Sequence, residues 1–123
     1  MWLIKITDTG DIEWDNMFGD SLDEYGYAVI ELENSDIIIA GTWLVKTNSS
    51  GQIIWANQSI DGNAIIRVDN NFVIIGGNNL VKINQDGSEI WSVYSEGGED
   101  LALASDSGFV VIEGLILKKF EYY

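Results

Sequence analysis

The chain of 123 residues contains no cysteine, no histidine and no proline. Without cysteine and histidine it can form no disulfide, no zinc finger, no thiol nucleophile and no histidine-dependent catalytic triad. Basic residues are also few, because six lysines and arginines stand against twenty aspartates and glutamates, which gives a formal net charge of −14. This charge opposes binding to nucleic acid or to an anionic membrane, so neither is expected as a partner.

Long apolar runs are missing as well, because no run approaches the roughly 18 residues of a membrane-spanning helix. The first residues, Met-Trp-Leu-Ile-Lys-Ile-Thr-Asp, do not show the basic segment and apolar core of a signal peptide, which slightly favours a cytoplasmic location. Apolar residues nevertheless make up 46% of the chain, and the mean hydropathy is +0.07. A disordered chain has far less apolar surface, so we expect residues 1–123 to form a single repeat domain.

One sequence pattern occurs three times, and it reads Leu-x-Lys-x-x-x-x-Gly-x-x-x-Trp. The copies span residues 3–14, 44–55 and 80–91, so that successive copies are 41 and then 36 residues apart. A fourth copy begins at 116–118, again 36 residues after the third. Three residue types that keep one spacing indicate repeated structural units. The repeated lysines are Lys5, Lys46, Lys82 and Lys118, the glycines are Gly10, Gly51 and Gly87, and the tryptophans are Trp14, Trp55 and Trp91.

Short apolar runs that end at a glycine repeat between these copies, at 36–41, 72–77 and 109–114. Each interval holds four runs rich in isoleucine and valine, separated by Gly, Asn, Asp and Ser, which is typical of β-strands. The runs are apolar at successive positions, which indicates strands covered on both faces. Four antiparallel strands per 36 to 41 residues are the unit of a β-propeller blade. The predicted fold is therefore all-β, with about three four-stranded blades per chain.

The Gly-x-x-x-Trp element with its preceding strand resembles the tryptophan-docking motif of quinoprotein-type (PQQ-like) propellers. It is similar as well to the Leu-Val-Lys-x-Asp-x-x-Gly blades of many uncharacterised bacterial and archaeal propellers. The resemblance implies that each repeated tryptophan packs on a neighbouring blade, near one of the repeated glycines. It also implies that the Leu-x-Lys strand is the third of a blade and the tryptophan strand the fourth. The first and third motif positions are usually alanine and an acidic residue in that family but leucine and lysine here, so no cofactor is expected.

This assignment divides the chain into two complete blades and two partial ones. Residues 2–18 supply the outer strands of one blade, 27–58 and 63–95 are complete blades, and 100–121 supply the inner strands of the last. Three blade equivalents are too few for a closed ring, because propellers have about four to eight blades. We therefore expect a homodimer that closes a six-bladed ring. The alternative is that the chain is a fragment of a longer propeller.

Few residues are candidates for a ligand site. Asp20, Asp23 and Glu24 lie in a lengthened loop and could offer oxygen ligands to Ca²⁺, although their spacing is not that of an EF-hand and solvated loop charge is the favoured interpretation. Trp2 and Trp43 each precede a repeat leucine and could form a shelf for a ligand, but packing between blades is favoured. The repeated lysines are expected to lie along a strand and to meet carboxylates, rather than to form a ring of cations.

Three classes of function remain, and the sequence displays no catalytic residue that would decide between them. The first is a non-catalytic binding or scaffold module that presents its rims to a protein partner. The second is a carbohydrate-binding, lectin-like propeller assembled from short subunits, for which Trp2 and Trp43 are the candidate residues. The third, an enzyme of the quinoprotein kind, ranks last because the chain is short and lacks that family's cofactor pocket. The fold alone does not decide between these three functions.

Overall fold

Residues 1–19 and 24–113 are described by the computed structural model. They form twelve β-strands and no helix, which confirms the all-β fold class. The calcium candidates Asp20 and Asp23 lie outside the described residues, as does the start of the fourth repeat at 116–118. In the described part of the chain there is no helix long and apolar enough to cross a membrane.

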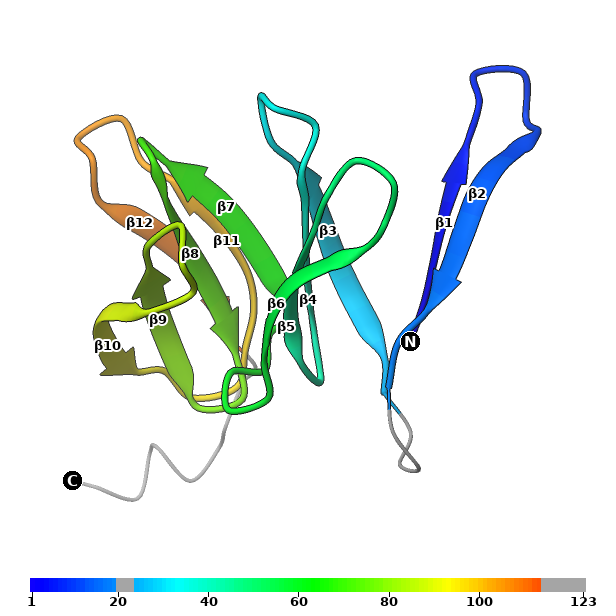
Figure 1. Cartoon of the computed structure of the whole chain (residues 1–123). Helices are drawn as coiled ribbons and strands as arrows, with labels where there is room; N and C mark the ends of the chain where they lie inside the picture. The colour runs from blue at the N-terminus through cyan, green and yellow to red at the C-terminus, as the bar shows by residue number, and fades with distance from the viewer. Residues whose placement is uncertain (20–23, 114–123) are drawn as a thin grey trace, which may run out of the picture.

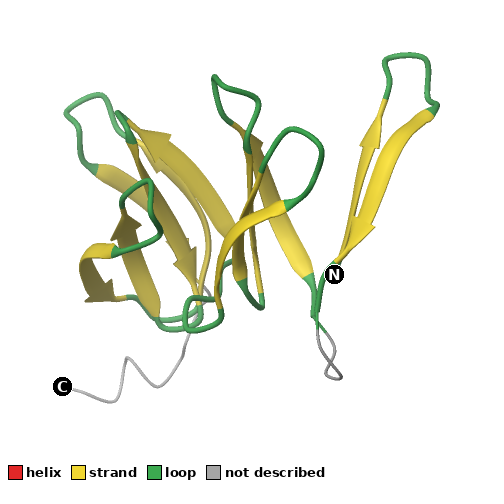
Figure 2. Ribbon diagram, in the orientation of Figure 1, coloured by secondary structure: helices red, strands yellow, loops and turns green. Residues whose placement is uncertain are grey.

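The strands pair antiparallel, and within each sheet their spatial order follows the sequence. Two sheets have four strands, in the orders β3-β4-β5-β6 and β7-β8-β9-β10, and two hairpins, β1-β2 and β11-β12, stand on either side of them (Figures 1 and 2). The strands are β1 (Trp2–Ile6), β2 (Ile12–Met17), β3 (Gly26–Glu31), β4 (Ile37–Gly41), β5 (Leu44–Thr47), β6 (Ile53–Asn57), β7 (Ala64–Val68), β8 (Asn71–Gly76), β9 (Asn79–Ile83), β10 (Glu89–Tyr94), β11 (Gly98–Leu103) and β12 (Phe109–Glu113).

The four layers stack face to face, with an apolar core between each pair of neighbours. The β1-β2 hairpin packs through Leu3 and Trp14 on Ile37 and Ile39 of the first four-stranded sheet. The largest core joins the two four-stranded sheets and is centred on residues of β4 and β8 such as Ile38 and Phe72. A third core joins the second sheet to the β11-β12 hairpin. The first strands of successive layers also meet, because β3 contacts β7 and β7 contacts β11.

Burial along the three equivalent apolar runs depends on how many layers cover them. Every residue of β4 is buried, and in β8 only the first is not. In β12, by contrast, Val110 and Ile112 are 60% and 59% exposed. The expectation that 109–113 is covered on both faces is therefore not met within the described chain. The reason is that no described layer stands beyond β12, so one face of this strand remains open.

The turns of the repeated motif share one hydrogen-bond pattern. In the turns 7–11, 48–52 and 84–88, the first residue receives a backbone hydrogen bond from the glycine and donates one to the carbonyl of the last residue. The glycines have φ of +94°, +81° and +82°, a left-handed conformation that other residues adopt only with strain. This conformation explains why glycine occupies the same position in each repeat.

Candidate functional site

The repeated lysine and tryptophan of each motif are direct cross-strand partners, a relationship that the linear pattern does not display. In each pair the register shifts by one residue immediately beyond this position, so that a β-bulge recurs in all three hairpins. The pairs are Lys5 with Trp14, Lys46 with Trp55 and Lys82 with Trp91.

Two of the three tryptophans lie over the glycine turn of the next layer. A Cβ added to Gly51 would lie 2.5 Å from Cζ3 of Trp14, and one added to Gly87 would lie 3.1 Å from the ring of Trp55. Asn16 strengthens the first contact, because its amide donates to the carbonyl of Gly51 at 2.8 Å. The missing side chain at each glycine is what allows the indole to approach the backbone so closely.

Trp91 and Gly10, the last repeated tryptophan and the first repeated glycine, make no such contact. In the described chain Trp91 lies over none of the repeated glycines, and none of the repeated tryptophans lies over Gly10. The ring of Trp91 packs on Phe109 instead, with centroids 6.1 Å apart and planes inclined by 58°. Around Gly10, no atom lies within 4 Å of an added Cβ. Within the described residues, one repeated tryptophan therefore has no repeated glycine turn beneath it, and one repeated glycine turn has no tryptophan above it.

Gln85 connects the two four-stranded sheets through both its backbone and its side chain. Its carbonyl oxygen accepts a hydrogen bond of 3.0 Å from the indole Nε1 of Trp55. The ammonium of Lys46, a residue only 8% exposed, donates to the same carbonyl and to Oε1 of the Gln85 side chain at 3.3 Å. The Gln85 amide in turn donates to the carbonyl of Asn70. Lys46 thus meets an amide, not the carboxylate expected from the sequence, whereas Lys5 does pair with Glu13 at 3.1 Å.

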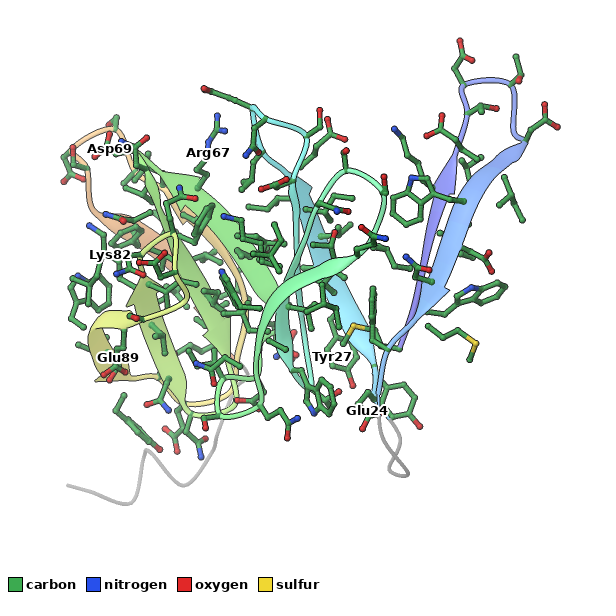
Figure 3. The ribbon with its side chains drawn as sticks, in the orientation of Figure 1. Glu24, Tyr27, Arg67, Asp69, Lys82 and Glu89 are labelled. Carbon is green, nitrogen blue, oxygen red and sulfur yellow. The ribbon has the colours of Figure 1, made fainter. Side chains whose placement is uncertain are left out.

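A polar groove of about 240 Å³ opens beside Gln85, at the end of the layers where the hairpin turns lie. Its walls come from the turn between β3 and β4 and from the turn between β7 and β8. Arg67 and Glu33 face each other across it at 3.5 Å, and both side chains are substantially exposed. Figure 3 shows Arg67 and Asp69 at this upper end of the molecule.

A second groove, largely apolar, separates β1 from β3. It consists of two hollows of about 240 and 200 Å³, both lined by Leu3 and Val29. Tyr27 and Trp2 complete one hollow and Lys5 the other, and the side chain of Val29 is 58% exposed within it. Apolar surface of this kind is open because β1 has no paired strand on this side among the described residues.

Of the predicted ligand residues, the structure describes Trp2, Trp43 and Glu24, and these lie in different surroundings. Trp2 is 59% exposed and its Nε1 donates to Oδ2 of Asp15 at 3.0 Å, whereas Trp43 is half-buried against the core beneath β1 and β2. Glu24 is half-buried at the start of the segment before β3. Among residues 1–19 and 24–113, no three acidic, histidine or cysteine side chains gather to hold a metal ion. The two tryptophans therefore do not form a common shelf in this chain.

Sequence reasoning missed Gln85, Arg67 and Glu33. Gln85 has serine and aspartate at the equivalent positions, so the repeat carries no signal for it. Arg67 is the only basic residue of the described chain outside the repeated lysine position, and that exception is a signal that could have drawn attention to the groove. Its pairing with Glu33 joins strand β7 to the turn between β3 and β4, more than thirty residues earlier, and the linear order does not show that the two meet.

Comparison with known proteins supports a statement about the fold alone. No family model and no curated protein matches the chain. Among solved structures, the chain is similar to a protein of unknown function from Bacteroides caccae, whose crystal structure was determined at 1.35 Å resolution. The two share 15% sequence identity with a TM-score of 0.61, over 89% of this chain and 45% of that one. The chain thus matches less than half the length of that protein.

Proposed function

We propose that the chain forms blades of a β-propeller and acts as a non-catalytic binding module for a protein with a basic surface. The face-to-face layers support the propeller architecture, because each four-stranded sheet is buried on both sides and the first strands of neighbouring layers adjoin. The fold by itself hosts many functions, so the binding role rests on the surface and not on the architecture.

The observation that carries the proposal is the acidic rim formed by the hairpin turns. Consecutive strands are antiparallel, so the turns after β1, β3, β5, β7, β9 and β11 lie at the same end of the layers (Figure 1). All but one of the carboxylates in these turns are exposed. Among the described cations, Arg67 forms an ion pair with one of them, Glu33, and the ammonium of Lys46 lies on Gln85, next to Asp86. The rim carboxylates are Asp8, Asp11, Glu33, Asp36, Asp69, Asp86 and Asp106.

A rim of this composition attracts positively charged partners. Backbone hydrogen bonds close several of the turns that carry the carboxylates, so the fold gathers the negative charges on one surface. Exposed charges of opposite sign attract each other over about 8 Å at physiological ionic strength, and the range of this attraction shortens as salt is added. The polar groove beside Gln85 offers, on the same rim, a concave place for an anchoring side chain of the partner.

An array of basic, acidic and neutral peptides probed with the purified chain tests this function. We expect binding to basic peptides that weakens steeply between low and physiological salt. Replacing Asp36, Asp69 and Asp106 together by asparagine keeps their turn geometry, because asparagine retains an acceptor oxygen and tolerates a positive φ. This triple variant should lose most of the binding.

A matched control removes the same charge elsewhere. Asp15, Asp61 and Glu99 lie on β2, before β7 and on β11, away from the rim, and their amide variants should bind the basic peptides nearly as well as the parent chain. Equal loss in both triple variants would show that only net charge matters. Binding that ignores salt and both variants would contradict the proposal.

Carbohydrate binding is the alternative, and the exposed indole of Trp2 favours it. Trp2 is hydrogen-bonded to Asp15 and stands beside Tyr27 in the apolar groove, so an aromatic face and a carboxylate occur together there. A glycan array distinguishes the two functions, because sugar binding should disappear in Trp2→Ala and stay insensitive to salt. Binding to glycans without binding to basic peptides would favour this alternative.

A further inference from the structure

The two hairpins at either end of the described chain correspond to the two halves of one four-stranded sheet. The β1-β2 hairpin repeats β5-β6 and β9-β10, including the lysine–tryptophan pair and its bulge. The β11-β12 hairpin repeats β3-β4, since in both the register shifts just after the first glycine, Gly98 or Gly26. The order β11-β12-β1-β2 would therefore reproduce the order β3-β4-β5-β6.

Compared with a four-stranded sheet, each hairpin lacks one strand partner within residues 1–19 and 24–113, that of β1 in one hairpin and that of β12 in the other. In the complete sheets the second strand pairs with the third, and there Ile39 is opposite Val45 and Ile74 is opposite Val81. The corresponding residue of β12 is Val111 and that of β1 is Ile4. The register that would join β12 to β1 is thus fixed by two internal examples.

Tryptophan docking has one contact missing at each end of the series. Trp14 covers Gly51 and Trp55 covers Gly87, so the next contact in order would place Trp91 over a turn equivalent to Gly87. Gly10 is such a turn, with the same left-handed φ and open space where an indole would lie. Gly51 and Gly87 are buried by their tryptophans, whereas Gly10 is exposed.

The exposed apolar faces of the two end layers also correspond to the two sides of an interface that the chain forms between its inner layers. Val29, Ile65 and Leu101 hold one position on the first strands of successive layers, and they are 58%, 7% and 7% exposed. Ile65 and Leu101 are covered by the second strand of the preceding layer, through residues equivalent to Val110 and Ile112. Val29 is open because its described neighbour, β1-β2, has no such strand.

We propose that two copies of this chain form a closed six-bladed ring in which β12 of one copy pairs with β1 of the other. Val111 lies opposite Ile4 of the second copy, Trp91 docks over its Gly10, and Val110 and Ile112 cover its Val29. The apolar groove between β1 and β3 is then filled by β11 and β12 of the second copy. This inference rests on the propeller architecture proposed above.

A second copy is the occupant that the surfaces favour, because the groove continues an interface that the chain already contains. The layers repeat the same contacts twice internally, and the described residues of each copy hold both the hairpin that fits the groove and the groove itself. Two copies supply six blades, within the range of about four to eight, whereas three copies would supply nine. The two seams are equivalent, as a two-fold axis requires.

A pair of cysteines tests the register directly, because the parent chain has none. Directly opposite residues in antiparallel strands have Cα atoms about 4.5–5.5 Å apart, within the about 4.4–6.8 Å that a disulfide spans. The variant carrying Ile4→Cys and Val111→Cys should therefore oxidise to a covalent dimer of twice 13.7 kDa, seen in a non-reducing gel and by mass spectrometry.

The matched control shifts one cysteine by a single residue. In Ile4→Cys with Ile112→Cys the two side chains lie on opposite faces of the sheet, so the covalent dimer should be at least tenfold less abundant. Equal yields from the two variants, or a ladder of higher multimers, would overturn the ring. A parent chain that sediments as a monomer at micromolar concentration in physiological salt would overturn it as well.

Two open glycines provide an independent test without cysteine. Gly10 and Gly97 both have positive φ and open space around an added Cβ, but Gly97 lies between β10 and β11, at the opposite end of the layers. Gly10→Asn should weaken dimerisation at least tenfold, while Gly97→Asn should leave it unchanged. A monomer that still binds basic peptides refutes the second copy but not the binding function, and a dimer that binds none refutes the binding function but not the ring.

Discussion

The indole Nε1 of Trp55 donates a 3.0 Å hydrogen bond to the backbone carbonyl of Gln85, across the interface between the two four-stranded sheets. The same ring lies over Gly87, two residues further along that turn. The Trp55 side chain therefore makes both an apolar contact with the neighbouring turn and a directional hydrogen bond to it. Together these two interactions set how the turn is oriented on the indole as well as how close it lies. Lys46, opposite Trp55 on the adjacent strand, adds a second donor to the same carbonyl.

Trp55→Ala should destabilise the fold more than a typical surface substitution. Truncation of a well-packed aromatic residue costs about 3–5 kcal/mol, and the half-buried state of Trp55 points to the lower end. Trp55→Phe should recover part of this loss, since it restores apolar contact but not the hydrogen bond to Gln85. Chemical denaturation followed by circular dichroism measures the difference. Tyr94→Ala, on an exposed side chain of β10, is the control and should be nearly neutral.

Gly51→Ala should be more harmful than Gly97→Ala, and Gly51→Val more harmful still. Both glycines have a left-handed φ, so the backbone strain is similar at the two positions. Only at Gly51 does the new Cβ collide with a ring, that of Trp14. The difference between the two alanine variants in the free energy of unfolding therefore isolates the indole contact, and we expect at least about 1 kcal/mol, as for other overpacked sites. Equal stability of the two would argue against a close contact between Trp14 and Gly51.

The buried ammonium of Lys46 should be coupled energetically to Gln85. Lys46→Met keeps the apolar stem but removes the donor, and Gln85→Ala removes the side-chain acceptor while it leaves the backbone carbonyl. A double-mutant cycle measures the coupling, expected at about 0.5–1.5 kcal/mol for one hydrogen bond of this kind. Lys82 provides the control, because within the described residues it forms no hydrogen bond to Gln85, whereas Lys46 does. Additive effects of Lys46→Met and Gln85→Ala would mean that the contact does not stabilise the fold.

Spacing was sufficient to predict the strands but not the contacts between them. The interval of 36 to 41 residues and the apolar runs near Ile38 and Ile74 indicated antiparallel strands, because a repeat can be recognised without any knowledge of pairing. The cross-strand pairing of Lys46 with Trp55 was not predicted, since it depends on a bulge that shifts the register by one residue. A bulge leaves no composition signal in a single sequence.

The polar side chains that join the layers were the part that sequence could not supply. Gln85 and Arg67 act through partners on another sheet, and those partners are set by how the layers stack. The exposure of Val110 was also missed. An apolar residue in a sequence indicates that its side chain is to be covered, but it does not indicate whether the covering layer belongs to the same chain. The prediction that residues 2–18 and 100–121 join across a dimer remains to be tested.

Val29→Asp should separate the two copies without unfolding either. Val29 is 58% exposed in the single chain, so a carboxylate there remains hydrated until a second copy covers it. Desolvation of an unpaired charge is costly, and we expect at least a tenfold weaker dimer by sedimentation velocity. Val93→Asp, at a similarly exposed position on β10, adds the same charge away from the groove and should leave the dimer intact. Similar effects of the two substitutions would point to charge repulsion alone.

Because the layers are stacked, the ease with which a layer opens locally depends on its position in the stack. A layer with neighbours on both faces can open only if two interfaces break, whereas a layer at either end needs to lose one. Amide hydrogen exchange should therefore be slowest in β4 and β8, whose residues are almost all buried, and should quicken toward β1 and β12. In a closed ring no layer is terminal, so this gradient of protection would flatten as the protein concentration rises.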